Sequence, residues 1–229
     1  MSKHSMPPPS LAALSQALLR SPLHGLDLPQ RAATPGATHG VVASELPNLG
    51  YLVLRGGPGD AAFHAAVAAV LQVALPQQPR TWSVGSGGSA VALWLAPDEW
   101  LLVCRRIGRD ALLQALEQAL AGLFAQVVDN SGGLTALRLA GPAHLRLLHH
   151  LGPYDFARLD VGACVGTVMS GVSVTVMRTD AAGVLLLCRR SFAEHLWRLV
   201  ERNARPYTLC ISTPQHNADP VLAPLLDAT

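Results

Sequence analysis

Leu101-Leu102-Val103-Cys104-Arg105-Arg106 recurs almost unchanged as Leu185-Leu186-Leu187-Cys188-Arg189-Arg190, and positions 101 and 185 differ by 84. A second echo has nearly the same offset. Leu54-Arg55 followed by Gly57-Pro58 recurs as Leu137-Arg138 followed by Gly141-Pro142; positions 58 and 142 again differ by 84, and positions 54 and 137 by 83. Two different motifs with nearly one spacing favour a duplicated unit over a chance similarity between two Leu-rich strands.

The first copy of the motif lies in a regular succession of elements. Residues 51–55 read as a strand, and a helix follows with Asp60 as its cap and an apolar face at 63, 67, 70, 71 and 74. Residues 91–95 and 100–104 form a predicted hairpin. A second helix follows Asp110, with a leucine stripe that continues through Phe124, and residues 126–129 close the unit as a strand.

The second copy repeats this order. A strand at 134–139 precedes a helix that Pro142 opens, and residues 152–166 look irregular. Residues 172–177 and 184–188 form a hairpin, and Ser191 and Glu194 have capping-box spacing at the start of the last helix. A strand at 207–212 ends the unit.

Strand, helix, strand, strand, helix, strand is the ferredoxin-like βαββαβ order. The sequence therefore predicts an α+β protein with two ferredoxin-like halves. We expect an N-terminal arm at 1–50, halves at 51–131 and 132–212, and a C-terminal surface tail at 213–229. Within the arm, residues 1–9 are expected to be mobile, 10–18 to form a short helix capped by Ser10, and 24–50 to be irregular.

The composition restricts the class of protein. Of 229 residues, 50% are hydrophobic and only 14% charged, and the formal net charge is +2. A chain this apolar is not disordered, and its low charge favours a large protein interface. No basic stretch alternates with aromatic residues, so nucleic-acid binding is not expected. No apolar run is long enough to span a membrane.

The cysteines and the N-terminus indicate a compartment. Cys104, Cys164, Cys188 and Cys210 form no Cys-x-x-Cys pair, so we expect buried thiols rather than a zinc or redox site. Pro7-Pro8-Pro9 stands where a secretory signal would be continuously apolar. We therefore expect a cytoplasmic protein.

Several motifs suggest chemistry, but their context favours structural roles. Gly85–Ala90 fits a dinucleotide fingerprint, yet a strand rather than a helix follows it. His149-His150 has no further ligand at metal spacing. Asp129-Asn130-Ser131-Gly132-Gly133 reads as a turn, and Asp98 and Glu99 point to opposite faces of a strand. The sequence thus indicates no catalytic, cofactor-binding or metal-binding residue in this chain.

The paired arginines at the strand ends have two interpretations. Arg105-Arg106 and Arg189-Arg190 could capture a phosphate or carboxylate, or they could form hydrogen bonds at a protein interface. We favour the interface, because arginine is enriched there. The candidate interface residues are Trp94, Asp98, Glu99, Trp100, Arg105, Arg189, Arg190, Phe192 and Trp197.

An ordered set of short motifs resembles a known family. The set comprises Ser21-Pro22-Leu23, Leu93-Trp94-Leu95, Pro97-Asp98-Glu99-Trp100-Leu101-Leu102, Val128-Asp129, Leu139-Ala140-Gly141-Pro142, Arg190-Ser191-Phe192-Ala193 and Leu196-Trp197. In this order the motifs resemble the gamma subunit of heterotetrameric sarcosine oxidase, from about Ser21 to Ala204. Residues 213–229 and the Gly85–Ser89 loop do not match that pattern.

The resemblance implies the fold of the folate-binding part of the glycine-cleavage aminomethyltransferase. It also implies an accessory subunit of a flavoenzyme that oxidatively demethylates sarcosine to glycine, with tetrahydrofolate as one-carbon acceptor and oxygen as electron acceptor. FAD, FMN, NAD, tetrahydrofolate and zinc would then be held by the partner alpha, beta and delta subunits, and none by this chain.

Three alternatives remain open at this stage. The chain could be a free-standing folate-binding protein of the aminomethyltransferase type, a subunit of a related secondary-amine dehydrogenase, or a homodimeric scaffold. Folate binding by the isolated chain would distinguish the first of these from an accessory subunit.

Overall fold

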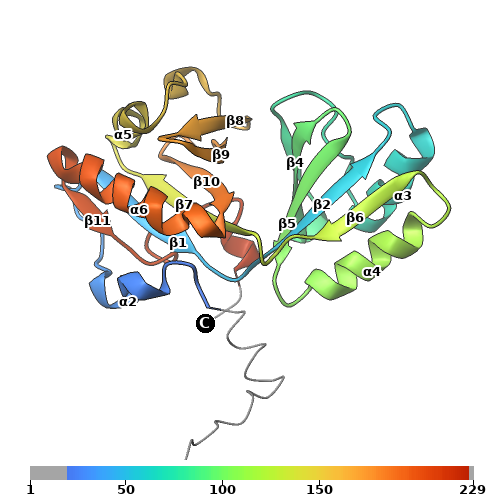
Figure 1. The fold of residues 1–229 in the computed structure, drawn as a ribbon, viewed down its shortest axis with the longest axis horizontal. Helices are drawn as coiled ribbons and strands as arrows, with labels where there is room; N and C mark the ends of the chain where they lie inside the picture. The colour runs from blue at the N-terminus through green and yellow to red at the C-terminus, as the bar shows by residue number, and fades with distance from the viewer. Residues whose placement is uncertain (1–19, 227–229) are drawn as a thin grey trace, which may run out of the picture.

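The structure is a computed structural model, and it describes residues 20–226. The predicted mobile lead at 1–9 and the predicted helix at 10–18 lie outside the described residues. Between residues 20 and 226, no helix has both the length and the apolar composition needed to cross a bilayer. Figure 1 shows two sheets side by side, each with its own pair of longer helices.

The first unit has the predicted order with one additional strand. Its elements are β2 (Leu49–Gly56), α3 (Ala61–Leu71), β3 (Trp82–Val84), β4 (Ala90–Ala96), β5 (Glu99–Arg105), α4 (Arg109–Ala119) and β6 (Ala125–Asp129). The sheet order is β3-β4-β5-β2-β6, with antiparallel neighbours throughout. This is the ferredoxin-like arrangement with β3 added at one edge, and β3 was not predicted because it is only three residues long.

The second unit comprises β7 (Leu134–Ala140), α5 (His144–Leu151), β8 (Cys164–Met169), β9 (Val172–Met177), β10 (Gly183–Arg189), α6 (Arg190–Ala204) and β11 (Leu209–Ile211). Both predicted hairpins of the chain are confirmed. The irregular conformation expected for 152–166 is wrong at its end, because β8 begins at Cys164 and pairs with β9.

The irregular conformation expected for 24–50 is also wrong. The segment contains α2 (Leu28–Arg31) and β1 (Val41–Leu46), and β2 already begins at Leu49. Strand β1 lies in the second sheet, between β7 and β11, and pairs with β11 in parallel. It therefore takes the position beside β7 that the fourth strand of a ferredoxin-like unit would occupy. Figure 1 shows β1 and β2 running in succession from one half into the other.

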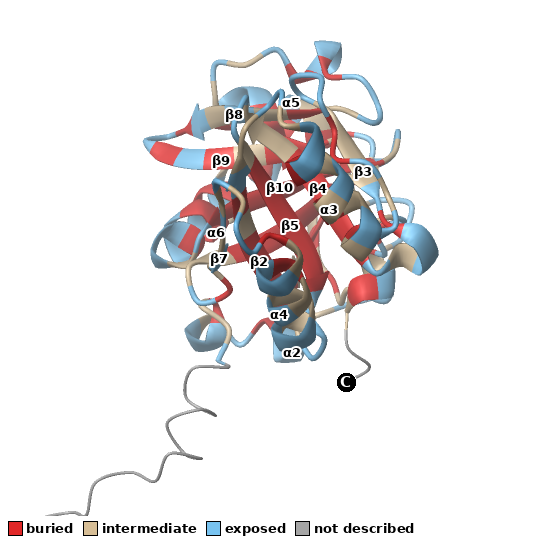
Figure 2. Cartoon of the chain, turned by 90° about the vertical axis from the view of Figure 1, so that its right-hand side faces the viewer, coloured by how far each residue is buried: buried red, intermediate tan, exposed pale blue. Residues whose placement is uncertain are grey.

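The described residues form four layers. Helices α5 and α6 cover the outer face of one sheet, and α3 and α4 cover the outer face of the other. The inner faces of the two sheets pack together over a central core. Strand β5 shows the period of two that this requires: Leu101 and Val103 face the central core, whereas Leu102 and Cys104 face the helices. In Figure 2 the strands between the helices are accordingly buried.

Two local predictions concern helix ends. Asp60 caps α3 as expected, since its carboxylate accepts from the amides of Ala62 and Phe63. The capping box at Ser191 and Glu194 is wrong. Helix α6 begins at Arg190, two residues earlier than a Ser191 cap requires, and Glu194 pairs with Arg198 instead.

The end of α4 also differs from prediction. The leucine stripe holds through Leu116 and Leu120, which are buried, but Phe124 lies beyond the helix and is 98% exposed. The remaining short helices are 3-10 turns at His24–Leu26, Ser86–Gly88, Phe156–Arg158, Arg205–Tyr207 and Ala223–Leu225.

The C-terminal segment is not the surface tail that we expected. Leu222 and Leu225 are buried in the central core, and the buried Asp219 carboxylate pairs with the Arg138 guanidinium and accepts from the Thr179 hydroxyl. The prolines of residues 213–229 favoured an exposed segment. Leu222 and Leu225 instead pack in the central core, and Asp219 binds Arg138 and Thr179. The segment therefore helps hold the two sheets together.

Candidate partner-binding surface

The predicted interface residues divide by burial. Asp98, Arg105, Arg189 and Phe192 are exposed, and Trp94, Glu99 and Arg190 are half-buried. Trp100 and Trp197 are only 1% and 0% exposed, because each packs between its sheet and its helices. The prediction that Trp100 and Trp197 belong to an interface is therefore wrong, and both are core residues. The seven others remain a predicted interface, spread over both halves.

The duplicated arginine pairs separate in space. Arg106 and Arg190, the second arginine of each pair, line one hollow at the junction of the two halves. Arg105 lines a different hollow together with Leu71 and Leu112. Arg189 lines a third hollow, a cleft between the two sheets. The repeat therefore brings one guanidinium from each half to a common place. We call this hollow the junction pocket and define it by Ser21, Glu45, Tyr51, Arg106, Thr135 and Arg190.

Glu45 is the carboxylate of the junction pocket. It stands on β1, and its oxygens accept hydrogen bonds from the Ser21 hydroxyl at 2.6 and 2.5 Å. The Thr135 hydroxyl lies 3.5 Å from one of them. Burial raises the pKa of Glu45 from its ordinary value, and the Ser21 hydrogen bond and the Arg190 charge oppose that rise. The Glu45 carboxylate thus accepts hydrogen bonds from neutral hydroxyl groups, at a position that is partly shielded from solvent.

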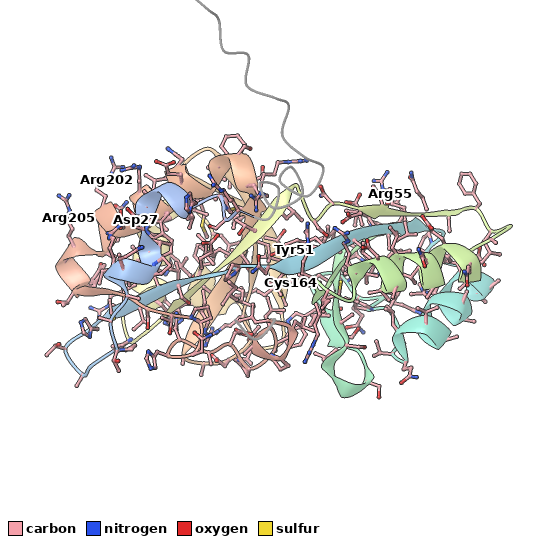
Figure 3. The ribbon with its side chains drawn as sticks, turned by 90° about the horizontal axis from the view of Figure 1, so that it is seen from below. Asp27, Tyr51, Arg55, Cys164, Arg202 and Arg205 are labelled. Carbon is pink, nitrogen blue, oxygen red and sulfur yellow. The ribbon has the colours of Figure 1, made fainter. Side chains whose placement is uncertain are left out.

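Tyr51 supplies an unused polar group to the same pocket. Its side chain is 2% exposed, and its hydroxyl has no hydrogen-bond partner among the described residues. Burial raises the pKa of Tyr51 above its usual range, and the charges of Glu45, Arg190 and Arg106 also act on the phenol. In Figure 3 Tyr51 lies near the middle of the molecule, where the chain passes between the halves.

The loop between the halves supports the pocket. The Ser131 hydroxyl accepts a hydrogen bond from the Tyr51 amide at 2.9 Å. The Ser131 amide donates to the Asp129 carboxylate, also at 2.9 Å. Asp129 also pairs with Arg109 at 3.1 Å. The predicted turn at 129–133 is therefore confirmed, and the Asp129 carboxylate is engaged in structural contacts.

A larger cleft lies between the sheets, with a volume of about 460 Å³. Val53, Leu95 and Leu101 of the first sheet give one wall, and Ser173 and Thr175 of β9 give the other. Glu99 lies at the cleft and is held by Arg55 at 2.6 Å. The cleft combines apolar and hydroxyl groups, with the one carboxylate already paired.

Neither the thiols nor the histidines form a reactive cluster in the described part of the chain. All four cysteines are buried and free, as predicted. Burial raises the pKa of Cys104 and Cys164 to about 11 and that of Cys188 to about 12, so these thiols stay protonated at neutral pH. His149 and His150 are both exposed, and no group of three metal-ligating side chains occurs between residues 20 and 226.

Sequence reasoning missed the centre of the junction pocket. Glu45 was assigned to an irregular arm, and Tyr51 was read only as the start of a strand. One available signal was the position of Glu45 as the single charged residue within the apolar run Val41–Leu46. A charge in such a run needs a partner, although the sequence does not show that Ser21 provides it.

These features define a class: a protein of two ferredoxin-like halves packed sheet against sheet, with its duplicated arginines meeting at the junction. The model of the sarcosine oxidase gamma subunit family matches residues 55–205. Sarcosine oxidase subunit gamma of Corynebacterium sp. (strain U-96) is 34% identical over 183 residues, which cover 79% of this chain and 87% of that relative. The same subunit of Arthrobacter sp. is 35% identical over 184 residues, with the same coverage. The chain belongs to the sarcosine oxidase gamma subunit family.

Solved structures agree with the assigned fold. A chain of the heterotetrameric sarcosine oxidase from Corynebacterium sp. U-96, in complex with pyrrole 2-carboxylate, is 31% identical and superposes with a TM-score of 0.74. The match covers 82% of this chain and 96% of that one. Aminomethyltransferase T of the glycine cleavage system from Bartonella henselae is 16% identical, with a TM-score of 0.58 over 80% of this chain and 57% of its own. The α+β fold predicted from the sequence is thus confirmed.

Proposed function

We propose that this chain is the accessory, non-catalytic gamma subunit of a heterotetrameric sarcosine oxidase-type flavoenzyme. The observation that carries the proposal is the match to a chain of heterotetrameric sarcosine oxidase over 96% of that chain. The reaction would be the oxidative demethylation of sarcosine to glycine, with tetrahydrofolate as one-carbon acceptor. The same reasoning applies if the amine is a related secondary amine.

The chemistry of the described side chains supports an accessory role. The carboxylates Glu99, Asp129 and Asp219 are each held by an arginine. The thiols are buried and protonated. The junction pocket measures about 20 Å³, room for about one water-sized group and far too little for a flavin or pterin ring. As the proposal has it, FAD, FMN, NAD, tetrahydrofolate and zinc are held by the partner alpha, beta and delta subunits.

We further propose a cytoplasmic location, supported by four unpaired thiols in a chain that folds around them. Proteins of oxidising compartments commonly join such residues in disulfides.

The test is expression of the chain with and without its partners. Alone, the chain should be folded, colourless and unable to consume oxygen with sarcosine. Coexpressed with the alpha, beta and delta subunits, it should purify within a yellow, active complex. A coloured and active lone chain would refute the proposal.

One observation favours a second candidate, a folate-binding protein of the aminomethyltransferase type. The inter-sheet cleft, at about 460 Å³, lies within the size range of small-molecule sites. Calorimetry with tetrahydrofolate separates the two candidates. Micromolar binding to the isolated chain, weakened by Glu99→Gln in the cleft and unaffected by Asp129→Asn outside it, would favour the second candidate. If tetrahydrofolate gives no heat of binding, the result supports the first candidate, the accessory gamma subunit.

A further inference from the structure

The junction pocket carries more positive charge than its own residues balance. Arg106 and Arg190 form no ion pair with any residue between 20 and 226. Glu45 offers one negative charge, but its closest donors are the Ser21 and Thr135 hydroxyls. Burial lowers the pKa of Arg106, and the neighbouring Arg109 and Arg190 charges lower it further, while the Asp129 and Asp110 charges oppose that shift. A second anion at this place would relieve that repulsion.

An unpartnered donor lies beside these cations. The Tyr51 hydroxyl is buried without a hydrogen-bond partner among the described residues, which costs about 1–3 kcal/mol for a group of this kind. The Arg190 guanidinium donates to the Arg20 carbonyl oxygen but has no carboxylate partner among the described residues, and the same holds for Arg106. Together with the Tyr51 hydroxyl, these groups are donors of the kind that a carboxylate uses. The hollow, at about 20 Å³, has room for one end of a ligand about the size of a carboxylate oxygen.

The surroundings of the pocket indicate a protein ligand rather than a free ion. Ile107 follows Arg106 directly and is 84% exposed, and Phe192 lies two residues after Arg190 and is 45% exposed. Neither side chain lines the pocket itself, but both lie on the exposed surface within two residues of an arginine that does. Tyrosine and arginine in a desolvated pocket are among the residues in which interface hot spots are enriched.

We propose that the junction pocket anchors an acidic side chain of a partner subunit, whose carboxylate binds Arg106, Arg190 and the Tyr51 hydroxyl while flanking apolar residues cover Ile107 and Phe192. The inference rests on the proposed function, because it needs a partner subunit, and it adds the place and the chemistry of the contact. It also gives the duplication a role, since each copy of the repeat supplies one arginine.

The sharpest test is Tyr51→Phe, which removes only the unpartnered hydroxyl. In the lone chain the midpoint of thermal unfolding should stay the same or rise, because no hydrogen bond is lost. In the assembly, affinity for the partner subunits should fall about tenfold, as expected for a lost hydrogen bond to a charged group. If the Tyr51 hydroxyl has only a structural role, Tyr51→Phe will leave the affinity for the partner subunits unchanged.

A charge-reversal pair gives the second test. Arg106→Glu with Arg190→Glu should weaken association at least about a hundredfold, and affinity should become less sensitive to salt. The matched control is Arg202→Glu with Arg205→Glu, the same change of charge at the exposed far end of the second half (Figure 3). The control should bind as the wild type does.

The readout is affinity of the full chain for the coexpressed partner subunits, measured by competition against tagged wild-type chain. If the wild-type chain does not associate, the proposed function fails. If the wild type associates and both Tyr51→Phe and the Arg106/Arg190 double variant bind equally well, the anchor is refuted. Equal losses in the double variant and in the Arg202/Arg205 control would also refute it.

Discussion

At the scale of single residues, Glu45 shows how a buried charge depends on its neighbours. Its strand carries it into the junction between the halves, where burial raises its pKa above the ordinary 4.5. The folded chain therefore binds this proton more tightly than the unfolded chain does. Linkage then requires that the free energy of unfolding falls as the pH rises from below 4.5 to the raised value.

Glu45→Gln should remove that dependence, because glutamine keeps the shape and does not ionise. The stability of the variant relative to wild type should increase across the window above pH 4.5 and then level off. Urea unfolding of both proteins at a series of pH values measures the difference. A difference that stays constant with pH would contradict the assignment.

The two buried tryptophans allow a matched comparison. The Trp100 indole donates to the Pro76 carbonyl oxygen at 2.7 Å, whereas the Trp197 indole nitrogen has no partner among the described residues. Trp100→Phe should therefore cost about 1 kcal/mol more than Trp197→Phe, because it leaves a carbonyl unsatisfied. The loss of ring volume is common to both variants. Chemical denaturation measures the two costs, and an equal or reversed order would contradict the account.

Residue-level prediction succeeded where the local pattern determines burial. The four cysteines lie in apolar segments, and all are buried. It failed for Trp100 and Trp197, because an aromatic residue suits a core and an interface equally well. It also missed Glu45, whose partner Ser21 is 24 residues away in sequence.

At the scale of elements, the starts of α3 and α6 show whether a capping motif in the sequence forms a cap in the structure. Asp60 caps α3 through two backbone amides, so Asp60→Ala should destabilise the chain by about 1 kcal/mol. Ser191 makes no capping bond at α6, so Ser191→Ala should change stability by less than about 0.5 kcal/mol. Thermal unfolding of the two variants checks both. A larger loss for Ser191→Ala would mean that the capping box forms in solution.

Elements were predictable where their pattern is local. The β4-β5 and β9-β10 hairpins follow from alternating apolar runs joined by turn residues. Strand β1 was missed because its partners, β7 and β11, lie far along the chain. Its placement between them depends on the whole sheet and not on a local period.

At the scale of the whole molecule, the C-terminal segment packs Leu222 and Leu225 between the two sheets and is fixed to the second half through Asp219. This carboxylate is fully buried, and it pairs with Arg138, which is itself buried. Asp219→Ala should therefore cost roughly 3 kcal/mol or more, because it leaves a buried guanidinium with the half-exposed Asp180 as its one charged partner, besides the Thr179 hydroxyl. Asp110→Ala is the control: its carboxylate is 73% exposed, and its loss should cost little. Chemical denaturation measures both, and a small effect of Asp219→Ala would show that the segment is not part of the folded unit.

The duplication was the feature that best predicted the whole molecule. Nearly equal spacing of two motifs indicated two similar halves, and the family resemblance indicated how such halves pair. The order of strands around β1 and the packing of residues 213–226 could not be predicted, because both depend on contacts with residues far away in the sequence.

The central claim is that this chain acts as one subunit of a larger assembly and carries no redox cofactor itself. The most direct measurement is native mass spectrometry of the coexpressed subunits, followed by gentle dissociation. We expect one copy of this chain in an assembly of four different subunits, released at the mass of the bare polypeptide. An assembly that forms completely without this chain, or a released chain that retains a flavin or folate, would contradict the claim.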